Sequence, residues 1–387
     1  MRILHTSDWH LGRQFHGQGM LGHQAAYVDH LLATIAAEKV DLVVVSGDIY
    51  DRALPPVDAV ALAEETLGRL AASRARVVVT SGNHDSHQRL GFAAGLIDAA
   101  GVHLRTRARD VGTPVVVEDR HGPIAVYGLP YLDPEHLREP WGLARRSHEA
   151  ALGEAVRRVH ADLDGRPGHT RSVVMAHAFV AGGEPSDSER DISVGGVQSV
   201  PTALFDGFSY TALGHLHGRH RLTETVRYSG SPLAYSFSEA THTKGSWLVD
   251  LDADGVCGTE FVEAPVPRPL GRLRGRLDDL LADPVHAPVE TAWLQVVLTD
   301  TVRPAQAKAR LERRFPHVLS LSFEPEGAVA SAVPAARTGA GLSDHDITLE
   351  FVRDLRQRAA DEAESVLLAE ACDACSDDRD LDAGVVA

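Results

Sequence analysis

Several short apolar stretches in the first 220 residues are each followed by side chains that can bind metal ions. The stretches, which are typical of buried strands, begin near Ile3, Leu42, Val77, Val173 and Tyr210. The polar residues that follow them are Asp8 and His10, then Asp48, then Asn83, His84 and Asp85, then His177, and finally His215 and His217. Open α/β sheets place ligand sites at the carboxyl ends of their strands, where the loops converge. The order of these residues therefore predicts one site built from loops that lie far apart in the sequence.

The residue types indicate what such a site could bind. Asp8 and His10 are two residues apart, as are His215 and His217, so each pair points to one side of an extended backbone. Imidazole, carboxylate and amide oxygen together suit manganese, iron or zinc better than calcium. Any one of the 21 histidines is more readily explained as an ordinary surface or core residue. The joint pattern, in this order, favours a site for two metal ions.

The alternation of elements predicts an α/β fold for the first part of the chain. Helix-like stretches at 23–38, 57–73, 87–100 and 144–164 lie between the apolar strands. Continuous apolar strands are typical of sheets that are covered on both faces. The segment 222–262 carries hairpin-like runs, and a proline-rich stretch at 264–269 indicates a domain boundary.

Beyond this boundary the sequence predicts a small α/β module and a helical C-terminal segment. Strands at 291–298 and 318–323 flank a helix at 304–315. A stretch rich in Gly, Ala and Pro at 325–341 is typical of a linker, and two amphipathic helices are expected within 343–370. The predicted domains are therefore 1–264, 265–330 and 331–387.

Composition limits the class of protein. The chain has 387 residues, of which 44% are apolar and 24% charged, as in soluble globular proteins with a large core. No stretch approaches the roughly 18 apolar residues that a membrane span needs, and the start reads as a strand and not as a signal peptide. Three cysteines fit a reducing cytosol, and the pair Cys372 and Cys375 lacks the second pair that a structural zinc site needs. We expect a cytoplasmic protein without membrane contact.

The charge balance argues against DNA binding by the overall field of the protein. With 38 basic and 54 acidic residues the net charge is −16, so DNA would need a local basic surface or bound cations. Candidate basic residues are Arg138, Arg145, Arg146, Arg157 and Arg158. As one face of a helix they are more readily explained as solvated side chains.

The ordered motifs resemble those of the calcineurin-like metallophosphoesterase superfamily. Within it, the strings His5 to Gly12, Gly47 to Asp51 and Tyr228 to Pro232 are similar to the SbcD-type nuclease subunits of bacterial SbcCD complexes. The resemblance is clearest over 1–250 and spans nearly the whole chain. It implies a metallophosphoesterase β-sandwich flanked by helices, a small α/β capping domain that recognises DNA, and C-terminal helices that bind a partner ATPase.

The resemblance also implies a role for each site residue. The cofactors it implies are two divalent metal ions, with Mn²⁺ as the preferred ion. One ion would be held by Asp8, His10, Asp48 and His217, and the other by Asp48, Asn83, His177 and His215. His84 would protonate the leaving group or stabilise the transition state, and Asp85 is a candidate to orient its imidazole. Archaeal relatives have a histidine where Asp51 stands, so Asp51 is expected either to support the site or to be a solvated loop carboxylate.

The implied activity is that of a manganese-dependent nuclease of DNA repair, recombination and replication, associated with the nucleoid. It would degrade duplex ends from 3′ to 5′ and cut single strands and hairpins. Two copies would assemble with two SbcC-type ATPase subunits, and would pair through helices within 54–72 and 87–100, although these apolar stripes could equally pack on the sheet. The alternatives are a phosphoesterase for small phosphodiesters such as cyclic nucleotides, which needs neither the module nor the terminal helices, and a scaffold with a relic site.

Overall fold

The computed structural model describes the chain except for residues 167–169, 193–198, 327–342, 357 and 383–387. It divides into two compact units, Met1–Phe323 and Glu324–Ala387, which are described separately. Most of the linker predicted at 325–341, and the last residues of the predicted 265–330 domain, lie outside the described residues.

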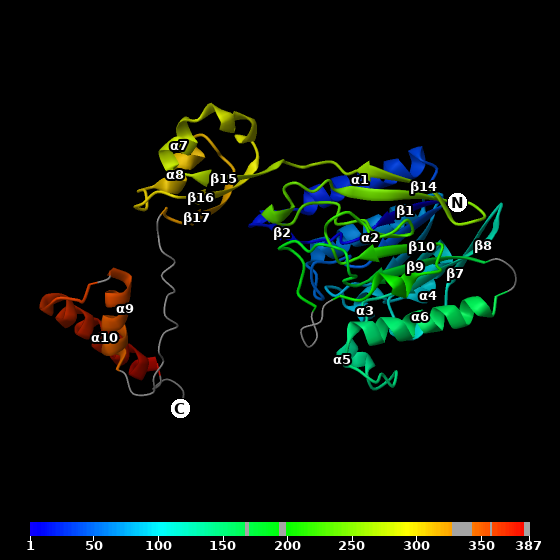
Figure 1. Cartoon of the computed structure of the whole chain (residues 1–387), viewed down its shortest axis with the longest axis horizontal. Helices are drawn as coiled ribbons and strands as arrows, with labels where there is room; N and C mark the ends of the chain where they lie inside the picture. Colours follow the sequence, from blue (N-terminus) through cyan, green and yellow to red (C-terminus); the bar gives the residue numbers. More distant parts are fainter. Residues whose placement is uncertain (167–169, 193–198, 327–342, 357, 383–387) are drawn as a thin grey trace. The chain divides into compact units, whose positions relative to one another are not determined.

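Two mixed sheets of six strands form the body of the first unit (Figure 1). In order across the first sheet the strands are β14 (Val256–Glu263), β13 (Gly245–Leu251), β1 (Arg2–Thr6), β4 (Leu42–Ser46), β5 (Arg76–Thr80) and β6 (Val102–Arg105). Across the second they are β11 (His220–Arg221), β12 (Val226–Tyr228), β10 (Tyr210–Gly214), β9 (Arg171–His177), β8 (Gly122–Leu129) and β7 (Val115–Asp119). The expected mixed α/β fold, with stacked sheets between helices, is confirmed.

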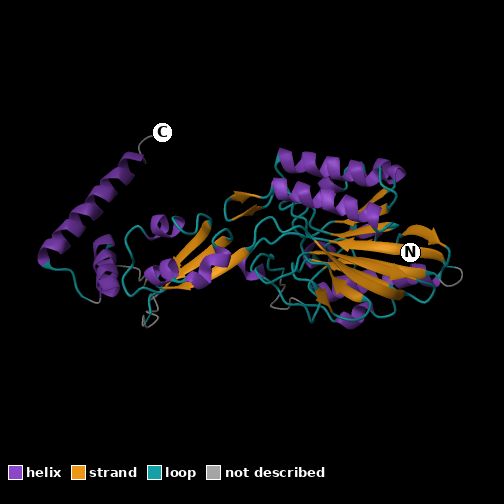
Figure 2. Cartoon of the chain, turned by 90° about the horizontal axis from the view of Figure 1, so that it is seen from above, coloured by secondary structure: helices purple, strands orange, loops and turns teal. Residues whose placement is uncertain are grey.

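Three apolar layers hold this body together. Helices α1 (Leu21–Ala37) and α2 (Val57–Ala71) cover the outer face of the first sheet, and α6 (His148–Asp164) covers that of the second (Figures 1 and 2). Between the sheets, residues such as Val44 and Val78 meet Val126 and Met175. Strands β4 and β9 are buried on both faces, and their central residues, 42–45 and 173–176, are accordingly continuously apolar and not alternating.

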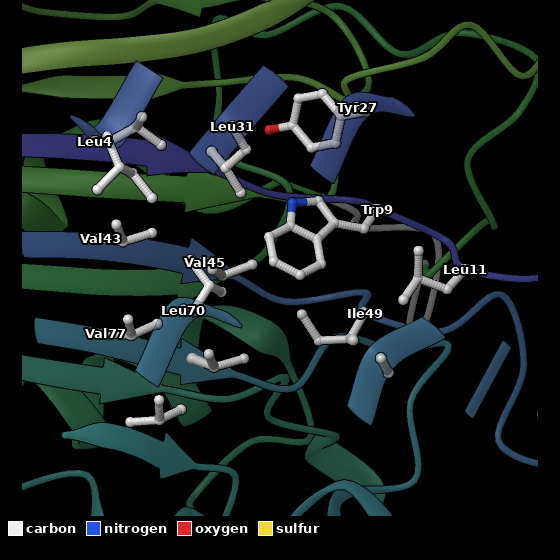
Figure 3. Close-up of a cluster of buried hydrophobic side chains, with 14 of the residues drawn as sticks. Leu4, Trp9, Leu11, Tyr27, Leu31, Val43, Val45, Ile49, Leu70 and Val77 are labelled. Atoms are coloured by element: carbon white, nitrogen blue, oxygen red, sulfur yellow. The ribbon is translucent and has the colours of Figure 1, made fainter. Parts of the chain in front are cut away.

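The layer under α1 and α2 reaches the loops at the strand ends. Leu4, Val43, Val45 and Val77 point from the strands toward Leu31 and Leu70 of the helices (Figure 3). Trp9 and Leu11 extend this layer beyond β1, and both are 2% exposed. Strands β1, β4 and β5 are parallel, as are β8, β9 and β10, so the loops that leave their carboxyl ends gather at one end of the sandwich.

The stretch predicted as one helix at 87–100 is broken. It forms α3 (His87–Leu90), α4 (Ala94–Ile97) and a 3-10 turn, η1 (Asp98–Ala100). Ala93 has a left-handed conformation with φ of 57°, which ends one helix before the next begins. Other short elements are β2 (Gln14–Phe15), β3 (Gln18–Gly19), α5 (Pro134–Leu137), η2 (Ala108–Asp110), η3 (Thr202–Phe205) and η4 (Phe237–Glu239).

A small module completes the first unit. Its parallel strands β15 (Leu270–Gly275), β16 (Trp293–Leu298) and β17 (Val318–Phe323) pack with α7 (Leu277–Ala282), the 3-10 turn η5 (Pro284–Val289) and α8 (Ala307–Glu312) around their own apolar core. Trp293 at the start of β16 stacks on Phe15, with ring centroids 5.3 Å apart. Phe237 packs edge-on against the same Phe15, with ring centroids 5.0 Å apart, so one aromatic cluster joins the module to the body.

The second unit consists of α9 (Asp344–Arg356) and α10 (Glu362–Asp382). An ion pair of 2.8 Å joins Arg356 to Glu364 at the turn between them. Apolar side chains stay exposed on both helices, among them Phe351 at 60% and Leu367 at 64%. Among the helices that the structure describes, none combines the length and apolar character needed to cross a bilayer.

Candidate metal centre

The predicted site residues meet where the carboxyl ends of the two sheets adjoin. Asp8 and His10 follow β1, Asp48 follows β4, Asn83 to Asp85 follow β5, His177 ends β9, and His215 and His217 follow β10. Within the described residues, three groups have ligand atoms that all lie within 4.8 Å of one another: Asp8, His10 and His217; His10, Asp48 and His84; and Asp8, Asp48 and His177. All six residues of these groups are buried.

The three groups share residues and form one cluster, and Asp48 lies at its centre. Its Oδ2 is 3.4 Å from Nε2 of His177, 3.7 Å from Nε2 of His10 and 4.0 Å from Nε2 of His84. The side-chain oxygen of Asn83 lies 2.9 Å from Nε2 of His177 and 3.2 Å from Nδ1 of His215. The structure therefore brings together all seven residues that the sequence proposed as ligands.

The backbone is strained at four of these positions. Asp8, His10, Asp48 and His215 have φ of 55°, 47°, 52° and 105°, a region that residues other than glycine rarely adopt. Hydrogen bonds between loops maintain it: the amides of Asp8 and His10 donate to the carbonyls of Gly47 and Asp48, each at 3.0 Å. Such strain costs about 1–3 kcal/mol per residue and concentrates at functional sites.

Burial and mutual proximity shift the protonation of the cluster. Burial raises the pKa of Asp8 to about 6, and Asp48 acts in the same direction. Burial opposes ionisation of Asp48 as well, but the neighbouring His177, His10 and His84 outweigh it and hold its pKa well below the usual range. For His177 burial is outweighed by Asp48 and Asp8, which raise its pKa to about 9. Because metal ligands must be deprotonated, a cation bound here would displace the proton that this raised pKa favours on His177.

The remaining imidazoles are suited to bind cations. Burial lowers the pKa of His10 and of His215 well below the usual range, so both rings are neutral near pH 7. Nε2 of His10 lies only 2.9 Å from Nε2 of His217, and Nδ1 of His10 has no hydrogen-bond partner among the described residues. Neutral imidazoles whose nitrogens converge on carboxylates fit divalent ions. The cluster could therefore bind metal ions.

His84 and Asp85 differ from the expected arrangement. Nδ1 of His84 lies 2.6 Å from the backbone carbonyl oxygen of Asp51, not against Asp85. The Asp85 carboxylate accepts instead from the amides of Ile49, Tyr50 and Gly82, at 3.1, 2.9 and 2.9 Å. Asp85 faces away from His84 because these three backbone amides, which belong to two loops, need a hydrogen-bond acceptor. It therefore ties the loop after β4 to the loop after β5.

Asp51 lies at the rim of the cluster. Its side chain is 17% exposed and its Oδ1 is 4.0 Å from Nδ1 of His84 and 3.7 Å from Nε of Arg13. Arg13 also donates to the carbonyl of Ser188 at 2.7 Å and lies over the ring of Tyr235. Sequence reasoning missed Arg13 because it lies just past the apolar strand pattern, with no spacing that marks it.

A set of side chains behind His217 was also missed. Ser188, Glu239 and Lys244 lie against it, although all three come from segments that read as loops or hairpins in the sequence. Of the five arginines that the sequence proposed as one helix face, only Arg157 and Arg158 lie on a helix, α6, and three of the five form ion pairs. Arg157 and Arg158 both pair with Glu154, and Arg146 pairs with Glu135.

Two protein-family models match this chain. The family model of the calcineurin-like phosphoesterases matches residues 1–219, more than half of the chain, and the chain belongs to this family. A second model, the SbcD C-terminal family, described as the type 5 capsule protein repressor C-terminal domain, matches residues 266–357. The two domains in this order are consistent with an SbcD nuclease subunit.

Solved structures show only a distant likeness. The crystal structure of TT1561 of Thermus thermophilus is 13% identical with a TM-score of 0.41, and covers 68% of this chain and 98% of its own. An archaeal phosphodiesterase, described as novel, is 11% identical with a TM-score of 0.31, and covers 68% of this chain and 100% of its own. These scores carry no argument about residues or activity.

Replacing Gly82 by Ala is expected to weaken metal binding about tenfold or more. A Cβ at this position would contact Oδ1 of Asp48 and lie 2.6 Å from its backbone nitrogen, so the central carboxylate must move. Isothermal titration of the metal-free protein with Mn²⁺ measures the affinity. Gly153→Ala in α6 is the control, because its Cβ would meet nothing within 4 Å. Equal affinities for both variants and the parent would contradict a role for Asp48 as a ligand.

Proposed function

We propose that this protein is the nuclease subunit of an SbcCD-type complex and hydrolyses phosphodiester bonds of DNA with Mn²⁺. The observation that carries the proposal is the presence, in one chain, of a buried Asp/His cluster in a phosphoesterase domain and of a C-terminal SbcD family domain. Its substrates are duplex ends, degraded from 3′ to 5′, and single strands and hairpins. The setting is DNA repair, recombination and replication in the nucleoid-containing cytoplasm.

Two ions divide the ligands between them in this proposal. Asp8, His10, Asp48 and His217 hold one ion, and Asp48, Asn83, His177 and His215 hold the other. The position of Asp48 within 3.4 and 3.7 Å of His177 and His10 supports a shared carboxylate. When bound, the ions supply positive charge to the phosphate and activate the attacking water. Cations at the site also attract DNA to a chain whose net charge is −16.

His84 acts on the leaving oxygen. Its Nδ1 faces the carbonyl of Asp51 at 2.6 Å, an acceptor that requires a proton on this nitrogen. Nε2 then faces the cluster, 4.0 Å from Asp48, and can carry a proton to the leaving group when the ring is protonated. Asp51 supports this ring through its backbone carbonyl.

Manganese-loaded protein is expected to degrade linear duplex DNA, and His84→Ser to lose about 100-fold or more of this rate because a proton donor is removed. Strands labelled at the 3′ or 5′ end and resolved on gels measure rate and direction, and titration with Mn²⁺ checks that the variant still binds ions. Hydrolysis of cyclic nucleotides without DNA degradation would favour a small-substrate phosphoesterase. Loss of ion binding in the variant would make His84 a ligand instead.

We also propose a homodimer through the apolar residues around α2 and α4. Helix α2 does pack on the first sheet, with Ala59, Leu62 and Leu70 buried. Large apolar side chains are nevertheless exposed in two segments. Leu54, Val57 and Val60, in and just before α2, are 67, 82 and 43% exposed, and Phe92 and Leu96, in and just before α4, are 79 and 80% exposed. Apolar side chains gathered in this way mark protein interfaces.

Leu96→Glu is expected to convert this dimer to a monomer because it places a charge in the apolar contact. Sedimentation velocity of the full chain measures the oligomeric state. Val302→Glu, at a site 78% exposed in the small module, is the matched control and is expected to remain dimeric. A monomeric parent protein, or a dimeric Leu96→Glu variant, would exclude this interface.

The partner in the proposed heterotetramer, two copies of each subunit, is an SbcC-type ATPase, and residues 331–387 form its binding segment. The module at 265–330 acts as the DNA-recognising cap of the nuclease domain at 1–264. Support for the binding segment comes from α9 and α10, where Ile347, Phe351, Val366 and Leu367 are 42 to 64% exposed. Two helices with an uncovered apolar side are suited to dock on another helical protein.

Deleting residues 340–387 is expected to abolish ATPase binding and to spare the basal nuclease rate, because the cluster lies in the other unit. Phe351→Asp is expected to weaken binding at least tenfold, whereas the control Val285→Asp, 67% exposed in the module, leaves it unchanged. Surface plasmon resonance with the purified ATPase measures both. Undiminished binding by the deleted chain would rule out this docking segment.

A further inference from the structure

A buried ion pair lies directly behind His217. Glu239 is 1% exposed and Lys244 is 8% exposed, and Nζ of Lys244 donates to Oε2 of Glu239. Burying two charges is costly unless further hydrogen bonds compensate both partners. Here two of the compensating contacts, from Lys244 to the carbonyl of His217 and from Ser188 to Glu239, lead to His217, which points to a role for the pair beyond stability.

The pair holds His217 at its backbone and at its ring. Lys244 donates to the carbonyl oxygen of His217 at 2.8 Å and to the hydroxyl of Ser231 at 3.0 Å. The other oxygen of Glu239, Oε1, accepts from the hydroxyl of Ser188 at 2.5 Å. This same hydroxyl oxygen lies 2.5 Å from Nδ1 of His217. The chain of contacts therefore runs from Lys244 through Glu239 and Ser188 to the imidazole.

The direction of these bonds fixes the tautomer of His217. The Ser188 hydroxyl has two acceptors besides His217: the Glu239 carboxylate at 2.5 Å and the Ser186 hydroxyl, which itself donates to Glu189, at 3.0 Å. An ionised carboxylate can only accept and is the closer and stronger acceptor, so the single proton of Ser188 goes to Glu239. The Ser188 oxygen must then accept from Nδ1 of His217, which carries the ring proton. A neutral imidazole has one N–H, and Nε2 is left with a lone pair. This Nε2 lies 2.9 Å from Nε2 of His10, inside the cluster with Asp8.

We propose that Ser188, Glu239 and Lys244 are positioning residues that hold His217 as the Nδ1–H tautomer and aim Nε2 at the ion bound by Asp8, His10 and Asp48. The proposal rests on the metal site of the proposed function but not on its substrate. Partners of this kind, which accept from the outer nitrogen of a ligand histidine, change metal affinity about 10- to 100-fold. If the ion pair served only to stabilise the fold, removing it would change the free energy of unfolding and leave the tautomer of His217 unchanged.

We call the hydrogen-bonded chain from Lys244 through Glu239 and Ser188 to His217 the relay. Ser188→Ala tests the relay without unpairing a buried charge, because Glu239 keeps its ion pair with Lys244. Long-range ¹H–¹⁵N correlation spectra of the metal-free full chain, with labelled histidine, report the tautomer; His217→Gln assigns the signal. We expect Nδ1–H in the parent and a larger share of Nε2–H in Ser188→Ala, where only Oε1 of Glu239, 3.5 Å from Nδ1 of His217, remains as a longer acceptor. The control is Ser246→Ala, another buried serine, whose hydroxyl lies 3.0 Å from that of Tyr27. An unchanged tautomer in Ser188→Ala would overturn the proposal.

Metal affinity provides the second readout. Titration with Mn²⁺ is expected to show one of two binding steps weakened about 10- to 100-fold in Ser188→Ala and the other unchanged. The double variant Glu239→Gln, Lys244→Met removes both charges, so its urea midpoint is expected near that of the parent while the same step stays weak. A double variant with both the stability and the Mn²⁺ affinity of the parent would limit the ion pair to a structural role.

These outcomes separate the relay from the proposed nuclease activity. The tautomer is measured without metal or DNA, so a protein that shows the expected tautomer and binding steps but leaves DNA intact would retain the relay and lose the nuclease assignment. The reverse, DNA cleavage with an Nε2–H ring at His217, would retain the nuclease and overturn the relay.

Discussion

Burying two carboxylates among several imidazoles is the constraint that governs this molecule. Asp8 and Asp48 are 0 and 1% exposed, and such groups lose several kcal/mol of hydration each unless partners replace it. The imidazole of His177 lies 3.4 Å from Asp48, and loop amides supply hydrogen bonds, such as that of His84 to Asp48 at 2.9 Å. The apolar layers on both sides of each sheet must stabilise the fold enough to carry this local cost.

The cost is localised because the ligands lie on loops that a rigid sandwich supports. Strands β4 and β9 are buried along their whole length, so the points where their loops begin are fixed by packing. The left-handed conformations of Asp8 and Asp48 then turn the side chains inward within one or two residues of the strand ends. Preorganisation of this kind keeps donor atoms converged before an ion arrives.

The segment between β12 and β13 connects three parts of the molecule. Tyr235 packs against His10 and His217 at ring distances of 5.5 and 5.9 Å, while Glu239, in the same segment, belongs to the relay. Phe237, between them in sequence, meets Phe15, on which Trp293 of the small module stacks. Contacts with the module and contacts with the metal centre are thus made by neighbouring residues of one short stretch.

The strands and the polar residues at their ends could be predicted without a structure, because apolar runs and the residues that follow them are local properties of the chain. Helix α2 and strand β17 lie where the pattern predicts them, whereas 87–100 breaks at Ala93, whose left-handed φ no periodicity reveals. The contacts that each of these side chains makes could be read only from the tertiary structure. His84 meets the carbonyl of Asp51 in place of Asp85, and Ser188 and Glu239 lie beside His217. These partners are set by loops from different strands meeting in space, and no spacing along the chain encodes that.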